Sequence, residues 1–157
     1  MASIMYADEV AENRSTTLFL DNCEVFERLS KRIKHHLSES VFTVSVWEIP
    51  DLIKSKEEDL ALFPRVKRHR GIHRHPENGR TCAYMTHTLI TEQGFAPHLT
   101  DSWREVTEKS GKYTHYWKKG DLVIWDNLAV MHKAGTKSVE GPDGRTPRML
   151  YRTQVFI

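Results

Sequence analysis

The sequence predicts a mainly β domain with helices inserted between the strands. Short runs rich in β-branched and aromatic residues lie at both ends of the chain, and a helical period separates them after Asn22. No internal repeat or low-complexity linker divides the 157 residues. Since domains commonly contain about 100 to 150 residues, we expect one domain over residues 1–157.

The N-terminal elements are two strands followed by a helix. Residues 3–7 and 16–20 are β-rich runs joined by a polar loop, which predicts a strand pair. After Asn22, apolar residues recur at helical spacing with charged residues between them, and Asp21 offers a side-chain cap. The pattern predicts one amphipathic helix packed on a sheet. Its apolar positions are Val25, Phe26, Leu29, Ile33 and Leu37.

The rest of the chain alternates between strands and two further helices. Strand patterns follow at residues 41–47 and 81–86, and residues 51–63 form a weaker helical pattern with an acidic centre. A capping signal at Thr100-Asp101 predicts a short helix within residues 97–108. The last third predicts only strands, at residues 114–117, 122–125, 129–134 and 148–156.

Composition restricts the class of protein and its partners. With 39% hydrophobic and 28% charged residues, the chain has the composition of a soluble globular domain. A net charge of +2 gives no argument for a polyanionic partner. No run of about 18 apolar residues and no signal-peptide pattern occurs, so we expect no membrane association and a cytoplasmic location.

Positive charge is densest at residues 65–70 and continues through His73, Arg74 and Arg80. A surface for single-stranded nucleic acid would interleave aromatic side chains that stack on bases. Residues 65–80 contain no Phe, Tyr or Trp. We interpret this segment as a solvated strand and turn, and expect no nucleic-acid partner.

Cys23 and Cys82 are the only cysteines. They are too few and too far apart in the sequence for a zinc motif or a disulfide framework. Cys23 opens the helical pattern and Cys82 lies in a strand-like run. We therefore predict two reduced thiols.

The most informative segment is residues 120–134, which reads as a turn, an apolar strand, a Trp125-Asp126-Asn127 turn and a strand bearing His132. Arg148 and Arg152 follow on the last strand and share one face, since strand side chains alternate. Alone, a strand histidine is more often a core residue, and two strand arginines are ordinarily surface residues. In this order they favour a metal and an anion held inside a β-barrel, because the planar guanidinium pairs well with carboxylates.

This segment closely resembles the C-terminal half of the taurine dioxygenase (TauD/TfdA) family of iron(II) and 2-oxoglutarate dependent dioxygenases. The strands at residues 2–10 and 16–21 resemble those that follow the family's His-x-Asp motif, so the resemblance spans nearly the whole chain. It implies a double-stranded β-helix, or jelly roll, that is incomplete at its N-terminus. It also implies iron(II) and 2-oxoglutarate as cofactors, and hydroxylation of a small organic substrate.

The resemblance assigns roles to four residues. His132 falls on the family's distal iron-ligand histidine. Thr17 and Arg148 fall on the residues that hold the far carboxylate of 2-oxoglutarate. Arg152 falls on an arginine that grips an anionic substrate in some members. No further catalytic residue is predicted.

One motif of the family is absent. No His-x-Asp sequence occurs in the chain, so two of the three protein ligands of a 2-His-1-carboxylate site are missing. We therefore expect a domain truncated at its N-terminus relative to the family. The nearest substitute, His75-Pro76-Glu77, adjoins an Asn78-Gly79 turn signal, and we interpret His75 as structural.

Two functions remain open from the sequence. The leading one is a dioxygenase domain that is active when residues upstream supply the His-x-Asp pair. The alternative is a non-catalytic remnant or fragment that binds a small dicarboxylate or a partner chain. An incomplete jelly roll exposes strand edges, which also opens a route to a homo-oligomer.

Overall fold

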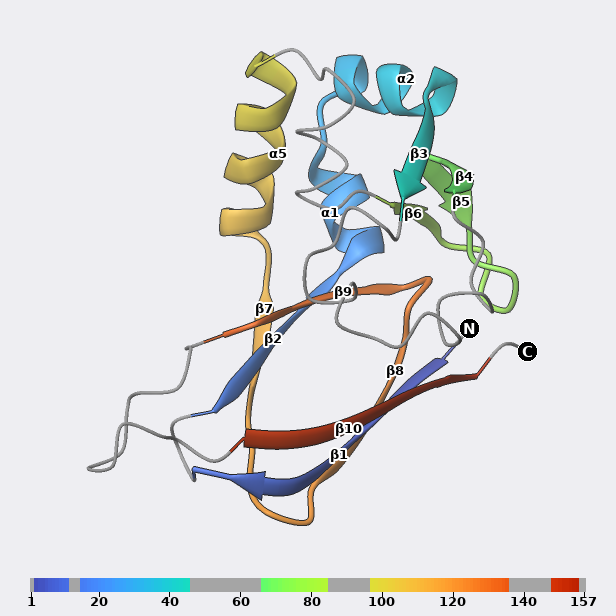
Figure 1. The fold of residues 1–157 in the computed structure, drawn as a ribbon. Helices are drawn as coiled ribbons and strands as arrows, with labels where there is room; N and C mark the ends of the chain where they lie inside the picture. The colour runs from blue at the N-terminus through green and yellow to red at the C-terminus, as the bar shows by residue number, and fades with distance from the viewer. Residues whose placement is uncertain (1, 12–14, 46–65, 85–96, 136–147, 156–157) are drawn as a thin grey trace.

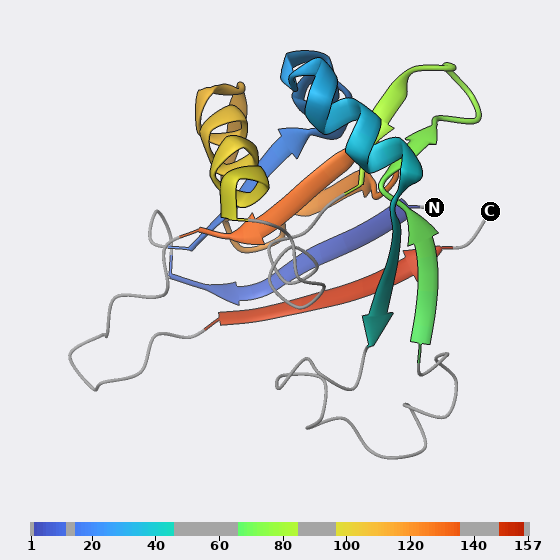
Figure 2. The same cartoon turned by 90° about the horizontal axis from the view of Figure 1, so that it is seen from above.

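The computed structural model describes residues 2–11, 15–45, 66–84, 97–135 and 148–155. Two three-stranded antiparallel sheets lie one above the other, and helices cover the far side of one of them (Figures 1 and 2). The chain is thus mainly β with inserted helices, as predicted. The helical pattern at residues 51–63 lies outside the described residues.

The first sheet has the strand order β10-β1-β8. Its central strand β1 (Ala2–Val10) is antiparallel to both β10 (Arg148–Val155) and β8 (Leu122–Asp126). Met5 lies opposite Arg152 on one side and Val123 on the other. This register places the C-terminal arginines beside the first strand of the chain.

The second sheet has the order β7-β2-β9. Its central strand β2 (Thr16–Asp21) pairs with β7 (Lys112–Tyr116) and β9 (Val130–Ala134), which places His132 opposite Phe19. The Trp125 ring of the first sheet meets the Phe19 ring at 5.3 Å between centroids. The two sheets therefore face each other, as the sheets of a jelly roll do.

The helix predicted from Asn22 to Leu37 is two helices, so the prediction of one continuous helix was wrong. Helix α1 (Asn22–Arg28) ends where Leu29 turns extended, and α2 (Lys31–Glu39) starts after Ser30. The Ser30 hydroxyl accepts the backbone N–H of Ile33 at 3.3 Å, which makes it an N-cap. The predicted cap at Asp21 is confirmed, because its carboxylate accepts the N–H groups of Cys23 and Glu24.

The main apolar core lies between the helices and the second sheet. Helix α5 (Pro97–Lys109) contributes the buried Trp103, while Leu20 and Met131 pack against the core from the outer face of the sheet. The helices therefore cover the outer face of the second sheet where Leu20 and Met131 lie. The buried core residues are Val25, Leu29, Ile33, Leu37, Phe42, Ala83 and Trp103.

Two small hairpins complete the described structure. Strand β3 (Val41–Ser45) pairs with β4 (Val66–Arg70), and β5 (Ile72–Arg74) pairs with β6 (Thr81–Ala83). Arg68, Arg70 and Arg74 are exposed, which agrees with a solvated strand and turn. Gly79 has φ of 69°, a left-handed conformation that glycine adopts without a Cβ penalty.

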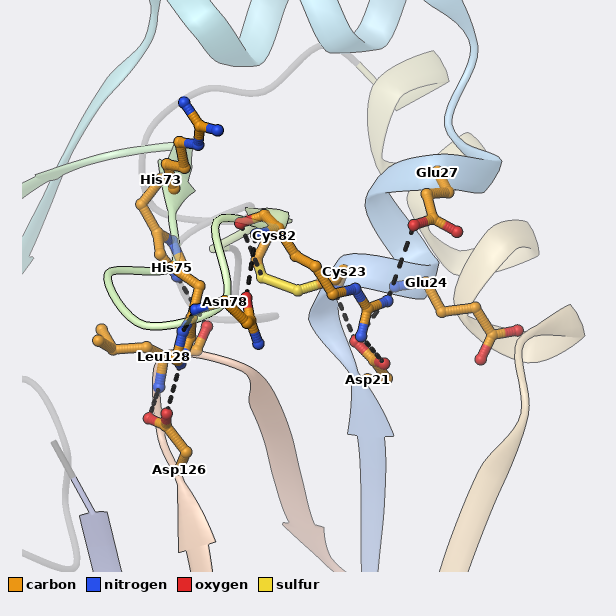
Figure 3. Close-up of a disulfide and its surroundings, with 12 residues drawn as sticks. Asp21, Cys23, Glu24, Glu27, His73, His75, Asn78, Cys82, Asp126 and Leu128 are labelled. Atoms are coloured by element: carbon orange, nitrogen blue, oxygen red, sulfur yellow. Dashed lines mark hydrogen bonds and ion pairs between the residues drawn. A yellow bond between two sulfur atoms is a disulfide. The ribbon is translucent and has the colours of Figure 1, made fainter.

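The prediction of two reduced cysteines was wrong, because Cys23 and Cys82 form a disulfide (Figure 3). The sequence separation of 59 residues argued against a bond, but the fold packs the start of α1 directly against β6. Both cysteines are fully buried. Distance along the chain therefore gave no measure of their distance in space.

The outer face of the first sheet is apolar and exposed. Tyr6 lies opposite both Tyr151 and Leu122, and these side chains are 41%, 57% and 60% exposed. Association of copies through strand edges stays a prediction. No described helix is long and apolar enough to cross a membrane.

Candidate functional site

Three side chains meet between the two sheets, those of His132, Trp125 and Arg152. His132 projects from β9 toward the Trp125 ring of β8, with 4.8 Å between ring centroids. The Arg152 guanidinium of β10 lies over the same Trp125 ring, 5.5 Å from its centroid. The sheet pairing thus brings His132 and Arg152 to one aromatic side chain, while the roles assigned to these two residues stay predictions.

The environment of His132 keeps its imidazole neutral. Burial, and to a smaller extent the nearby Arg152 cation, together lower the pKa of His132 to about 4. An imidazole binds a metal ion only in its neutral form. His132 therefore has a free nitrogen lone pair at all pH values well above 4.

Replacing Arg152 should raise the His132 pKa. In Arg152→Gln the cation is lost while the burial remains, so the pKa should rise from about 4 toward, without reaching, the ordinary histidine value of 6.5. A lowered histidine pKa destabilises the folded state as pH falls below 6.5. In that range the His132 imidazole binds a proton in the unfolded chain but stays neutral in the folded chain. The variant should therefore lose less stability between pH 6.5 and 4. NMR titration of the imidazole measures the shift, and an unchanged pKa would contradict the contact.

Arg152 is a cation without a carboxylate partner in the described part of the chain. Its Nη2 donates a hydrogen bond to the Ser3 hydroxyl at 3.1 Å, and partial burial lowers its pKa. The residue also keeps substantial exposure to solvent. The remaining N–H groups of a guanidinium held in this way can donate hydrogen bonds to an anion.

Thr17 is buried, with 3% of its surface exposed, and its hydroxyl accepts a hydrogen bond from the Trp117 indole at 2.8 Å. An indole N–H only donates, so the Thr17 hydroxyl must accept here and its own proton points elsewhere. Thr17 shares the inward face of β2 with Phe19. The Thr17 hydroxyl therefore keeps its own proton for another acceptor.

Arg148 opens β10, lies opposite Val10 and is exposed. It lies on the same strand face as Arg152, four residues earlier. The structure thus brings His132 and Arg152 together around Trp125 and places Arg148 farther along the strand. The role of Arg148 toward 2-oxoglutarate stays a prediction, as does that of Thr17.

The described residues do not by themselves fit an iron site. His132 supplies one imidazole, and nowhere in the described ranges do three His, Cys, Asp or Glu side chains gather as a metal ion would need. A 2-His-1-carboxylate site requires two more protein ligands. No reaction step can be derived through iron from these residues alone.

His75 has a structural role, as predicted. Its side chain is 5% exposed, and Nε2 donates to the Asp126 carboxylate at 2.6 Å (Figure 3). Burial alone would raise the Asp126 pKa, but the hydrogen bonds from His75 and from the Leu128 N–H lower it overall. His73 donates to the Leu128 carbonyl at 2.7 Å. The β5-β6 hairpin is therefore anchored to the turn between β8 and β9.

Sequence reasoning missed three polar partners of the site, namely Ser3, Asn127 and Trp117. Ser3 and Trp117 are fully buried and Asn127 is 8% exposed. A signal for Asn127 was present, because it follows Trp125 by two residues in the turn before the His132 strand. Ser3 carried no signal, since its role depends on the pairing of β1 with β10.

The fold and this site describe two facing β-sheets that hold one histidine and one arginine beside the same tryptophan. Comparison with known proteins specifies the family. A family model described as "Taurine catabolism dioxygenase TauD, TfdA family" matches residues 1–154. The chain therefore belongs to the TauD/TfdA family of 2-oxoglutarate dependent dioxygenases.

Individual relatives agree with this assignment. Pentalenolactone F synthase of Streptomyces arenae is 30% identical over 74% of this chain and 45% of its own length. A structure of AAD-2 in complex with Mn(II) and N-oxalylglycine has a TM-score of 0.72 at 22% identity, covering 96% of this chain and 60% of that one. A taurine dioxygenase from Burkholderia xenovorans has a TM-score of 0.69 at 21% identity, covering 96% and 50%. A protein assigned as an α-ketoglutarate dependent 2,4-D dioxygenase, from the same organism, gives 0.68 at 24%, covering 96% and 60%.

The solved structures establish the fold alone, because each is less than 25% identical to this chain. The chain spans about half the length of the curated relative and 50% to 60% of these structures. Residues 1–157 therefore correspond to part of the polypeptide in these relatives.

Proposed function

We propose that this chain forms part of an iron(II) and 2-oxoglutarate dependent dioxygenase that hydroxylates a small organic acid. In this proposal His132 is one metal ligand, Thr17 and Arg148 hold the far carboxylate of 2-oxoglutarate, and Arg152 binds the acid group of the substrate. Two further metal ligands come from polypeptide outside residues 1–157. The 157 residues would then form one domain, truncated at its N-terminus relative to the family.

The observation that carries the proposal is the meeting of His132 and Arg152 around Trp125. A neutral imidazole suits a metal, and an arginine without a carboxylate partner suits an anion. Two of the similar structures are named for taurine and for 2,4-D, which are both organic acids. N-oxalylglycine, present in a third, has the carboxylate spacing of 2-oxoglutarate.

The alternative is a non-catalytic fragment or remnant that binds a small dicarboxylate or a partner chain. It is favoured by one observation, the lack of a three-ligand metal cluster within the described ranges. The dioxygenase function and the non-catalytic alternative predict different activities once a segment with a His-x-Asp pair is added to the chain.

An assay of succinate formation distinguishes the dioxygenase function from the non-catalytic alternative. The 157-residue chain, supplied with iron(II), 2-oxoglutarate and O₂, should form no succinate above background, because a single imidazole holds iron poorly. A polypeptide extended upstream to include a family His-x-Asp pair should form succinate, measured by chromatography. Iron-dependent succinate from the unextended chain would contradict the ligand assignment. Failure of the extended polypeptide, when folded, would favour the non-catalytic alternative.

A further inference from the structure

A polar cluster lies buried beneath Arg152. The Asn127 amide nitrogen donates to the Ser3 hydroxyl at 2.7 Å, and its carbonyl oxygen accepts the Trp125 indole N–H at 3.0 Å. Ser3 is completely buried and Asn127 is 8% exposed. The cluster therefore links β1, β8 and the following turn without access to water.

Ser3 connects this cluster to Arg152. A hydroxyl has two acceptor lone pairs and one proton. The lone pairs receive Asn127 Nδ2 at 2.7 Å and Arg152 Nη2 at 3.1 Å, and the proton can bond to Asn127 Oδ1 at 3.1 Å. The Gln154 amide approaches only to 3.5 Å, longer than an ordinary N–H···O bond. Among its side-chain partners, Asn127 therefore makes the shortest contact with the Ser3 hydroxyl, whose backbone is held in β1.

The consequence for Arg152 is a fixed orientation. One N–H group is bonded to Ser3, and the guanidinium lies over the Trp125 ring, whose own N–H is held by Asn127. No carboxylate pairs with Arg152 among the described residues. Its other N–H groups are free for an anion, and less side-chain freedom is lost on binding because the group is already held.

Hydrogen bonds made by the residues next to Asn127 hold the turn that carries it. Asp126 accepts His75 Nε2 at 2.6 Å and the Leu128 N–H at 2.8 Å, while the Leu128 carbonyl accepts His73 Nε2 (Figure 3). These bonds flank Asn127 on both sides and do not involve its side chain. Truncating Asn127 should therefore remove the polar link while the turn keeps its place.

We propose that Asn127, acting through Ser3 and Trp125, is the residue that positions Arg152 for the acid group of the substrate. This inference rests on the proposed function, in which Arg152 contacts that acid group. It assigns Asn127 and Ser3 a positioning role and no contact with the substrate.

Binding of an acid and of its neutral amide tests the proposal without any metal. The probes are 2,4-dichlorophenoxyacetate and 2,4-dichlorophenoxyacetamide, titrated into the metal-free 157-residue chain by calorimetry. The wild-type chain should prefer the acid, and Arg152→Gln should remove the preference. Asn127→Ala and Ser3→Ala should each weaken acid binding about tenfold, a typical effect for a hydrogen bond to a charged group, and leave amide binding unchanged.

Ser15→Ala is the matched control for Ser3→Ala. Ser15 is also buried, at 2% exposed, but its hydroxyl has no hydrogen-bond partner among the described residues. This variant should bind both probes as the wild type does. A merely structural role of Asn127 would weaken acid and amide equally.

The outcomes separate the inference from the function on which it rests. If acid binding depends on Arg152 but Asn127→Ala and Ser3→Ala bind it as tightly as the wild type, the positioning role is overturned and the proposed function stands. Equal loss of acid and amide binding in these variants also overturns the positioning role. If the wild type binds acid and amide alike, or binds neither, the acid-binding role of Arg152 fails and the positioning role with it.

Discussion

His132→Ala is expected to abolish succinate formation in the polypeptide extended to include the His-x-Asp pair. The variant removes one of three metal ligands, so turnover should fall to background, a loss of at least about a thousandfold. His132 is partly buried among aromatic rings, and the alanine side chain has no atom that can bind a metal ion. Steady-state assays with 2-oxoglutarate measure the effect. Residual iron-dependent turnover above a few per cent would contradict the ligand role of His132.

Arg148→Ala is the informative companion variant. Arg148 is proposed to pair with the far carboxylate of 2-oxoglutarate, so its loss should raise the KM for 2-oxoglutarate and change kcat less. A hydrogen bond to a charged group contributes about 1.5 to 3 kcal/mol, which corresponds to roughly tenfold to a hundredfold in KM. An unchanged KM would remove Arg148 from the cofactor site and leave the His132 result unaffected.

Trp117→Ala should lower the free energy of unfolding by about 3 to 5 kcal/mol, the cost of truncating a large buried aromatic residue. Trp117 has no exposed surface, and its ring meets His115 edge-on at 4.5 Å between centroids. The fold would be left with a cavity beside Thr17. Urea denaturation of the 157-residue chain measures the change.

Trp117→Phe separates packing from hydrogen bonding. It keeps most of the apolar volume but leaves Thr17 without the indole N–H, so the loss of stability should be nearer 1 kcal/mol. Because the Thr17 hydroxyl is then free to rotate, 2-oxoglutarate binding by the extended polypeptide should weaken. Trp103→Phe is the matched control, since Trp103 lies in the helical core. Equal 2-oxoglutarate affinity in Trp117→Phe and wild type would show that the indole does not orient Thr17.

Much of the fold could be predicted because its signals are local. The strand that carries His132, the Asp21 cap and the turn at Asn78-Gly79 each depend on a few neighbouring residues, and the structure contains all three. The break between α1 and α2 was missed because Leu29 continues the apolar helical period. The Ser30 cap outweighs that period, and a capping serine inside an amphipathic pattern is easily taken for an exposed helix position.

The site was only partly predictable for a different reason. His132 and Arg152 could be proposed as site residues from strand positions and the family resemblance, but the polar support beneath Arg152 joins residues up to 149 positions apart. Contacts of that kind depend on sheet register, which no local pattern specifies. The Cys23–Cys82 bond was missed on the same ground, since α1 and β6 meet only in the folded chain.

The pairing of β1 with β10 has a consequence for how the chain folds during synthesis. Within residues 1–157, the central strand of the first sheet is synthesised well before the strand that carries Arg148 and Arg152. Contacts that close such long loops are slow to form, because the entropy of loop closure opposes them before the contacts stabilise anything. Nascent β1 therefore remains unpaired on the β10 side until β10 has been synthesised. During that interval the free edge of β1 is open to other chains, so we expect chaperone binding to nascent β1 to raise the yield of folded protein.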